Sequence, residues 1–309
     1  MHNKELKWYY YIIALVSPFT NAANYVLSKY VIDEVSPITL LFFRWLCALL
    51  ILTPFAIKLF IREFNNIRAN WRILFIMAIS GIVLFNFFTY LALRYTTSTN
   101  VSIIISIFPI LVLVLGAIID KQKLVLSQMY SILFSFTGVI IIVTKGDILQ
   151  GVTNLFSNSG DFITLAASAS LAIYVFAAKF KPPNLSYYSF LYSIILISTM
   201  LILPVYLLDI FYFQIVSEIN ILNVGVIFCI AIGALIGLMA LNLTVVKIGA
   251  NISAILFYTS PLFTTIMAMV ILGEKLEYFH LIGMLTILCG VNIPLVGRFF
   301  KKKSYPPIP

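Results

Sequence analysis

Arg44 is a charged side chain within a long apolar run, about seven residues from one end of that run. If the run is a membrane-spanning helix, a rise of 1.5 Å per residue places Arg44 roughly 10 Å deep. A charge at that depth is costly and usually faces protein or water. One interpretation is that Arg44 binds an anionic group, such as a substrate carboxylate, or gates access to it. The other is a structural arginine that is satisfied by backbone carbonyls or extends outward to the membrane surface.

Several neutral polar side chains also fall inside apolar runs. Asn86 and Tyr90 are four residues apart, so they share one face of a helix. A cavity for a polar solute needs neutral hydrogen-bond partners that both hold and release the solute. The alternative is that such groups bond one helix to another. The candidate binding residues of this kind are Asn24, Tyr25, Asn86, Tyr90, Tyr174, Asn242 and Tyr258.

Asn100 and Asn251 occupy equivalent places near the starts of two further apolar runs. Asparagine is a good N-cap residue, because its side chain accepts a hydrogen bond from the first turn of a helix. Capping is the first interpretation of this pair, and direct contact with a substrate is the second. Both asparagines therefore join the candidate binding residues.

Pro109 and Pro261 lie inside apolar runs at matching positions. A proline within a helix removes one backbone hydrogen bond and favours a kink. The matching positions suggest paired hinges or bends beside a central site. A fixed kink that packing requires is the alternative.

The elements that must position these residues are membrane-spanning helices. The chain has 309 residues, of which 62% are hydrophobic and 10% charged, with a mean hydropathy of +1.06. A soluble domain of this length would be less apolar, and the apolar runs are continuous rather than alternating as in a β-barrel. We predict an all-α membrane protein with ten transmembrane helices at about 8–28, 38–60, 72–93, 98–119, 125–144, 161–178, 186–208, 222–246, 252–272 and 279–298, each roughly 20 residues long.

The charges predict the orientation of these spans. With the N-terminus in the cytoplasm, 15 of the 20 lysines and arginines fall on the inner side and four on the outer. Eight of the eleven acidic residues fall outside. This bias follows the positive-inside rule and predicts that both termini are cytoplasmic. The net charge of +9 therefore reports topology, and we expect no nucleic-acid partner.

The sequence also repeats itself. Pro109 and Pro261 lie 152 positions apart, and Pro54 and Pro204 lie 150 apart. Each copy holds five predicted spans, and since five is odd, the second copy enters the membrane from the opposite side. Two inverted five-helix repeats are a common design of secondary transporters, with the substrate site near the midplane between the halves.

Chemistry beyond binding is not indicated. No Asp or Glu is predicted inside a span, neither His2 nor His280 is deep, and the three cysteines lack metal-ligand spacing. No glycine-rich phosphate loop with Gly-Lys-Ser/Thr is present, so ATP is not the driver. We predict no catalytic residue, no metal and no cofactor. We expect facilitated transport or exchange, or coupling through a loop carboxylate such as Glu274, rather than a buried proton relay.

Short motifs recur in order along both halves. They are Arg44-Trp45 with Ala48, then Asn86, Tyr90, Leu93, Tyr95-Thr96-Thr97 and Asn100, and later Gly249-Ala250-Asn251, Pro261, Gly273-Glu274-Lys275-Leu276, His280, Gly283 and Gly290-Val291. Together they resemble the EamA family of the drug/metabolite transporter superfamily over nearly the whole chain. The resemblance implies a metabolite transporter, since relatives include exporters of amino acids and other metabolites and some importers. Related sequences often carry aromatic residues where this chain has Leu171, Leu238 and Leu241, so no relative's substrate transfers directly.

These observations predict four regions. Residues 1–145 form the first repeat, 146–160 an outer connecting loop, 161–298 the second repeat, and 299–309 a basic cytoplasmic tail. We predict a non-enzymatic secondary transporter of the cell inner membrane, a monomer or a weak homodimer in the lipid bilayer. It moves a small polar metabolite, an amino acid or related compound, by alternating access, and export is favoured by family frequency.

Two alternatives stay open. The first is an importer of a nutrient or cofactor, such as S-adenosylmethionine or a nucleotide, although a phosphate-bearing substrate would want several basic residues in the cavity. The second is a membrane enzyme acting on lipids, which needs clustered acidic, His or Ser side chains near one interface. His280 with Glu274 and Glu277 is the one such cluster in the sequence.

Overall fold

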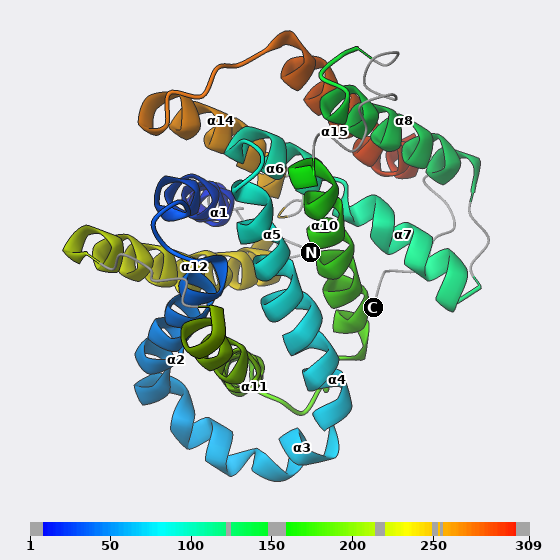
Figure 1. The fold of residues 1–309 in the computed structure, drawn as a ribbon. Coiled ribbons are helices and arrows are strands. Elements are labelled where there is room, and N and C mark those ends of the chain that lie inside the picture. The colour runs from blue at the N-terminus through cyan, green and yellow to red at the C-terminus, as the bar shows by residue number, and fades with distance from the viewer. Residues whose placement is uncertain are drawn as a thin grey trace.

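The computed structural model describes residues 9–121, 125–147, 159–213, 220–248, 253 and 256–300. Every regular element in these ranges is a helix, which confirms the all-α class for this part of the chain (Figure 1). In the first half these are α1 (Tyr9–Val31), α2 (Pro37–Arg62), α3 (Phe64–Ala69), α4 (Trp71–Met77), the π-helical η1 (Ala78–Leu84), α5 (Phe85–Leu93), α6 (Ser98–Ile105), α7 (Phe108–Ile119) and α8 (Leu126–Val143). In the second half they are α10 (Ser159–Ala177), η3 (Ala178–Phe180), α11 (Tyr187–Leu208), η4 (Asp209–Phe213), α12 (Ile221–Ile248), α14 (Ser260–Ile271) and α15 (Tyr278–Phe300).

Seven continuous helical stretches among the described residues are long and apolar enough to cross a bilayer. Their bounds lie close to the predicted second to eighth spans. Two shorter apolar helices, Ser260–Ile271 and Tyr278–Gly290, cover parts of the predicted ninth and tenth spans. The count of ten crossings remains a prediction.

The starts of α2 and α11 carry the same local signal. Ser36 and Ser186 each occupy the N-cap position, and each hydroxyl oxygen accepts a hydrogen bond from the backbone N–H three residues later. A serine in this place satisfies one of the free N–H groups of the first turn. Pro37 follows Ser36, where a proline costs no hydrogen bond.

α2 and α11 pack side by side and antiparallel, so that the end of each caps the start of the other (Figure 1). The Ser36 hydroxyl donates to a carboxylate oxygen of Asp209 at 2.8 Å. At the opposite end, Glu63 accepts from the backbone N–H of Ser186 at 2.9 Å and from its hydroxyl at 3.1 Å. Because α2 and α11 are equivalent helices of the two repeats, this reciprocal capping is what an inverted two-fold relation produces.

α8 and α15 form a close pair at one edge of the bundle (Figure 1). A Cβ atom on Gly138 would lie 2.7 Å from Cγ1 of Ile287 and 2.8 Å from the carbonyl oxygen of Gly283. The Ser131 hydroxyl donates to the carbonyl oxygen of Gly290 at 2.5 Å. Small residues thus let two backbones approach closely, which is a common basis of helix association in lipid.

The stretch that begins at Ser98 is interrupted between α6 and α7, at Ser106 and Ile107, and Pro109 follows in the first turn of α7. Pro261 holds the matching place in α14, directly after a turn at Tyr258 and Thr259. Each proline therefore sits in the first turn after a helix break, where its missing N–H is tolerated. Whether these breaks act as hinges remains a prediction.

Candidate functional site

Arg44 lies at the centre of a buried polar cluster between α2 and α5. Its side chain is 6% exposed. One guanidinium nitrogen, Nη1, donates to Oδ1 of Asn86 at 2.6 Å and also contacts the hydroxyl oxygen of Tyr90. The four-residue spacing on α5 does bring Asn86 and Tyr90 to one face, and that face meets Arg44.

The network continues into α1. The Tyr90 hydroxyl donates to Oδ1 of Asn24 at 3.2 Å, and the Ser28 hydroxyl donates to the same atom at 3.4 Å. The structure therefore unites four candidate binding residues from three helices. We call Asn24, Arg44, Asn86 and Tyr90 the Arg44 cluster.

A second branch links α1 to the second half of the chain. The amide of Asn21 donates to the Tyr25 hydroxyl at 3.2 Å and to the Ser260 hydroxyl at 3.3 Å. Tyr25 is 1% exposed, and Ser260 begins α14, directly before Pro261. The interrupted helix of the second repeat thus lies close to the residues beside the Arg44 cluster.

The π-helical turn η1 comes directly before α5 and shapes the cluster. The Asn86 amide donates to the carbonyl oxygen of Ile82 within this segment at 2.8 Å, which fixes the side chain with Oδ1 toward Arg44. Segments of π-helix inside longer helices are frequent at functional sites. Nothing in the hydrophobic pattern indicated this turn.

The charge of Arg44 is met by neutral groups. Its hydrogen-bond partners are an amide and a phenol, and its guanidinium carbon lies 4.8 Å from the centre of the Trp45 ring. Nε of Arg44 and the indole Nε1 of Trp45 are buried donors without a hydrogen-bond partner in the described part of the chain. A buried cation and two free donors suit the oxygen atoms of an anion, which form short, charge-assisted hydrogen bonds.

The remaining candidates lie elsewhere. The Tyr174 ring on α10 packs against Gly81 in η1. Tyr258 is half-buried beside an apolar cluster around Ile103 and Met284, and Asn242 is half-buried on α12. Asn251 lies outside the described residues.

Asn100 belongs to a different polar group, and capping is not its role. Thr97 is the N-cap of α6, since its hydroxyl oxygen accepts from the backbone N–H of Asn100 at 3.1 Å. The Asn100 amide instead donates to Oδ1 of Asp161 at 3.2 Å and to the Thr96 hydroxyl oxygen at 3.1 Å. The capping interpretation was wrong because the helix begins at Ser98, so Asn100 lies within its first turn.

Asp161 is buried, although the sequence predicts that it lies at the outer surface. It lies in the first turn of α10, is fully buried, and accepts from the Thr96 hydroxyl at 2.6 Å. Its position at the end of a predicted span suggested exposure. The four-residue spacing of Thr96 and Asn100, which puts two polar groups on one helix face, is the sequence pattern that could have indicated a buried polar partner.

The cluster of His280, Glu274 and Glu277 is a set of capping contacts. Glu274 accepts four hydrogen bonds, two from Ser98 and two from Thr99, at 2.7 to 3.1 Å. Nδ1 of His280 accepts from the backbone N–H of Glu277 at 2.9 Å. Within the described ranges, no group of three or more His, Cys, Asp or Glu could hold a metal ion.

Sequence comparison identifies the family of this chain. The profile of the EamA-like transporter family matches residues 8–144 and again residues 158–294. The chain belongs to the EamA-like transporter family. The two matches correspond to the two repeats, and the membership confirms the resemblance drawn from the short motifs.

Relatives of this EamA-like transporter are named as transporters without an assigned substrate. An uncharacterized transporter, YyaM of Bacillus subtilis, is 27% identical over 91% of this chain and 92% of its own length. An uncharacterized transporter of Archaeoglobus fulgidus is 26% identical over 88% of this chain and 92% of its own length. A crystal structure of another protein superposes with a TM-score of 0.62 at 15% identity, covering 95% of this chain and 99% of that one. That likeness shows the fold alone.

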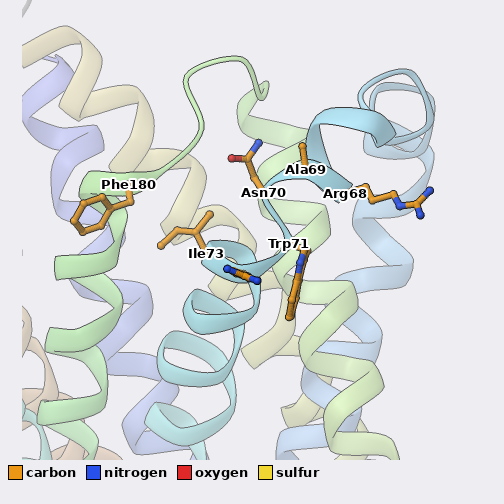
Figure 2. Close-up of a pocket in the computed structure, with 7 residues that line it drawn as sticks. Arg68, Ala69, Asn70, Trp71, Ile73 and Phe180 are labelled. Carbon is orange, nitrogen blue, oxygen red and sulfur yellow. The ribbon is translucent and has the colours of Figure 1, made fainter.

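Two surface hollows lie among the described residues of the EamA-like transporter, and neither of these is lined by the Arg44 cluster. One, of about 530 Å³, lies where α3 meets α4 and is lined by Arg68, Asn70, Trp71, Arg72 and Phe180, among others. Figure 2 shows Phe180 on one side of this hollow and Trp71 and Arg68 on the other. The second, of about 560 Å³, is an apolar groove along α2, α11 and α12. The apolar helices and the family together make the chain a multi-pass membrane transporter.

Proposed function

We propose that this protein moves a small metabolite with a carboxylate group, an amino acid or related compound, across the cytoplasmic (inner) membrane. The two repeats alternate in opening to either side, and export is the working direction. Arg44 anchors the substrate carboxylate, while Asn24, Asn86 and Tyr90 hold Arg44 in place and offer further hydrogen bonds. The observation that carries this proposal is a buried guanidinium whose partners are neutral and whose Nε has none among the described residues.

The neutral surroundings of Arg44 suit a transporter. An arginine paired with a fixed carboxylate would be neutralised in every state and would gain little from a substrate. Among the described residues Arg44 instead meets only neutral hydrogen-bond partners and aromatic rings, so an arriving carboxylate adds an interaction that the empty protein lacks. The binding is reversible because hydrogen bonds to the neutral partners continue to stabilise the charge of Arg44 after the substrate leaves.

Contacts between helix ends support the ten-span topology. Thr96 with Asp161 and Ser98 with Glu274 join ends that the alternation assigns to the outer side. Glu63 with Ser186 joins two ends assigned to the inner side, as does the ion pair of Lys179 with Asp120 at 3.1 Å. We infer ten crossings, with both termini in the cytoplasm and the two repeats at 1–145 and 161–298. Arg68 and Arg72 beside the first hollow then lie on the inner side, as the positive-inside rule requires.

The test is ligand binding by the purified protein in detergent. Because a ligand that binds the folded state raises its melting temperature, amino acids, nucleosides, S-adenosylmethionine and sugar phosphates are screened by thermal shift. We expect stabilisation by amino acids. The corresponding amines, which lack the carboxylate, should not raise the melting temperature. Stabilisation confined to S-adenosylmethionine or to phosphorylated compounds would favour import of a cofactor instead.

Arg44→Gln should weaken binding of the stabilising amino acid by about tenfold or more, since one charge-assisted hydrogen-bond pair contributes roughly 1.5–3 kcal/mol. The matched control is Arg68→Gln, which removes an exposed arginine far from the cluster and should leave affinity unchanged. Equal affinity of wild type and Arg44→Gln would exclude the carboxylate-anchor role.

A further inference from the structure

Asp161 carries a carboxylate that the proposed binding site does not use. It is fully buried at the start of α10, although it belongs to the first turn of a helix. Its two hydrogen-bond donors come from the other half of the chain. They are the Thr96 hydroxyl at 2.6 Å and the Asn100 amide at 3.2 Å from Oδ1 and 3.4 Å from Oδ2. The carboxylate therefore joins the first helix of the second repeat to the α5–α6 connection of the first.

Both donors to Asp161 are neutral. The charged and titratable groups at this end of the described chain include Lys29, whose Nζ donates to the carbonyl oxygen of Leu93, Arg94 and Tyr95 after α5, Lys145 and Asp147 after α8, and Glu274, whose carboxylate accepts from Ser98 at the start of α6. Lys145 acts on Asp161 electrostatically, and the ion pairs among the described residues, Arg62 with Glu63 and Lys179 with Asp120, do not include Asp161. A buried carboxylate without a paired cation is costly, and binding a proton removes that cost.

Asn100 has an atom that suits the protonated form. Its Oδ1 is buried and has no hydrogen-bond partner in the described residues, while its Nδ2 faces the carboxylate. When Asp161 is ionised, the amide donates to it through Nδ2. When Asp161 is protonated, a half-turn of the amide turns Oδ1 toward the new O–H group, which then donates to it. One amide thus serves both protonation states.

We propose that Asp161 is the proton-coupling site of this transporter, a role that rests on the proposed transport function. A proton from water on one side binds a carboxylate oxygen of Asp161 and forms an O–H group. After the two halves have rearranged, the same proton leaves to water on the other side, and the carboxylate is restored. Because Thr96 and Asn100 belong to one half and Asp161 to the other, the charge of Asp161 changes the strength of contacts that join them.

A proton fits this site better than a sodium ion. Sodium needs several oxygen atoms directed at it, whereas the Thr96 hydroxyl and the Asn100 amide direct hydrogens toward the carboxylate. The free oxygen that the group offers beyond the carboxylate is Oδ1 of Asn100. Sodium dependence is therefore the competing outcome that the experiment must separate.

The experiment uses the full chain in proteoliposomes, with a mixture of tritiated amino acids as the probe and the membrane voltage clamped by potassium and valinomycin. Counterflow, in which labelled solute exchanges for unlabelled solute without any gradient, measures transport alone. A gradient of about one pH unit should give about tenfold accumulation in one of its two orientations if one proton moves per turnover. A trapped pH-sensitive dye should report proton movement when the probe is added to wild type.

Asp161→Asn mimics the protonated form and should keep counterflow, but it should lose both the accumulation and the dye signal. Asp209→Asn is the matched control, because Asp209 is also buried at the outer end and accepts from a hydroxyl, that of Ser36. It should retain both signals.

Three results would overturn the inference. They are a wild type that shows counterflow without a dye signal, an Asp161→Asn variant that accumulates solute as wild type does, and accumulation that follows a sodium gradient alone. Since the dye readout is made on wild type, a missing signal overturns the inference even if the variant fails to fold. An absence of counterflow in wild type would instead reject the proposed transport of amino acids, and the coupling inference with it.

Discussion

Glu63 shows how one side chain at a helix end stabilises the bundle. Burial alone raises the pKa of its carboxyl group, but hydrogen bonds from the backbone and hydroxyl of Ser186, with Arg62 nearby, outweigh this and hold the pKa below its usual value. A lowered pKa means that the ionised form stabilises the fold. This contribution is complete above the unfolded-state pKa of about 4.3 and is lost as the pH falls through the lower folded-state pKa.

Glu63→Gln should therefore reduce stability at neutral pH by roughly 0.3–1 kcal/mol, the usual contribution of a negative charge at a helix N-terminus. The difference in melting temperature between wild type and variant should shrink in acid, below about pH 4.3, as the wild-type carboxylate is protonated. The measurement is thermal unfolding in detergent across this pH range. A difference that stays constant into acid would show that the charge of Glu63 contributes nothing.

The Arg44 cluster and Asp161 show which residues could be predicted from sequence and which could not. Arg44, Asn86 and Tyr90 stand out because charge and polarity are rare within apolar runs, and helical spacing puts Asn86 and Tyr90 on one face. Asp161 lies at a span end, where polarity is ordinary. Its burial depends on tertiary contact with Thr96 and Asn100, some sixty residues away in sequence, which no local pattern reports.

At the scale of helices, α8 and α15 pack closely, and their close approach depends on glycines that carry no side chain. Gly138→Ala places a Cβ atom 2.8 Å from the carbonyl oxygen of Gly283 and 2.9 Å from the backbone nitrogen of Ile287. Backbone atoms have no alternative rotamer that would relieve the clash, so the two helices must move apart. We expect a destabilisation of about 1–3 kcal/mol, measured as a lower melting temperature.

Gly225→Ala is the matched control, because a Cβ atom there meets nothing within 4 Å. It should be neutral or slightly stabilising, since alanine favours helix over glycine by up to about 1 kcal/mol. If both variants melt alike, close contact does not hold α8 against α15. The apolar runs predicted where the helices lie, and Pro109 predicted a bend beside it, whereas no sequence pattern indicated the π-helical turn at η1.

At the scale of the whole molecule, the inverted repeat explains why equivalent residues end up at opposite surfaces. Ser36 and Ser186 cap equivalent helices, yet Ser36 meets the end of α11 while Ser186 meets the end of α2. In the proposed topology the two ends of this antiparallel pair face opposite sides of the membrane. Repeat spacing and charge bias could predict this arrangement from sequence, because both are properties of the chain as a whole.

The proposed orientation makes a direct prediction about accessibility. Lys275 and Arg68 are both exposed basic residues at connections between helices, and the topology places Lys275 outside and Arg68 inside. After Cys47, Cys229 and Cys289 are replaced by alanine, Lys275→Cys should react in intact cells with a maleimide that cannot cross the membrane. Arg68→Cys should react only after the cells are opened, which also proves that its thiol is reactive. The reverse pattern would invert the whole protein in the membrane. Labelling of both in intact cells would place both connections on the outer side, which the odd number of spans predicted between them, the third to the ninth, does not allow.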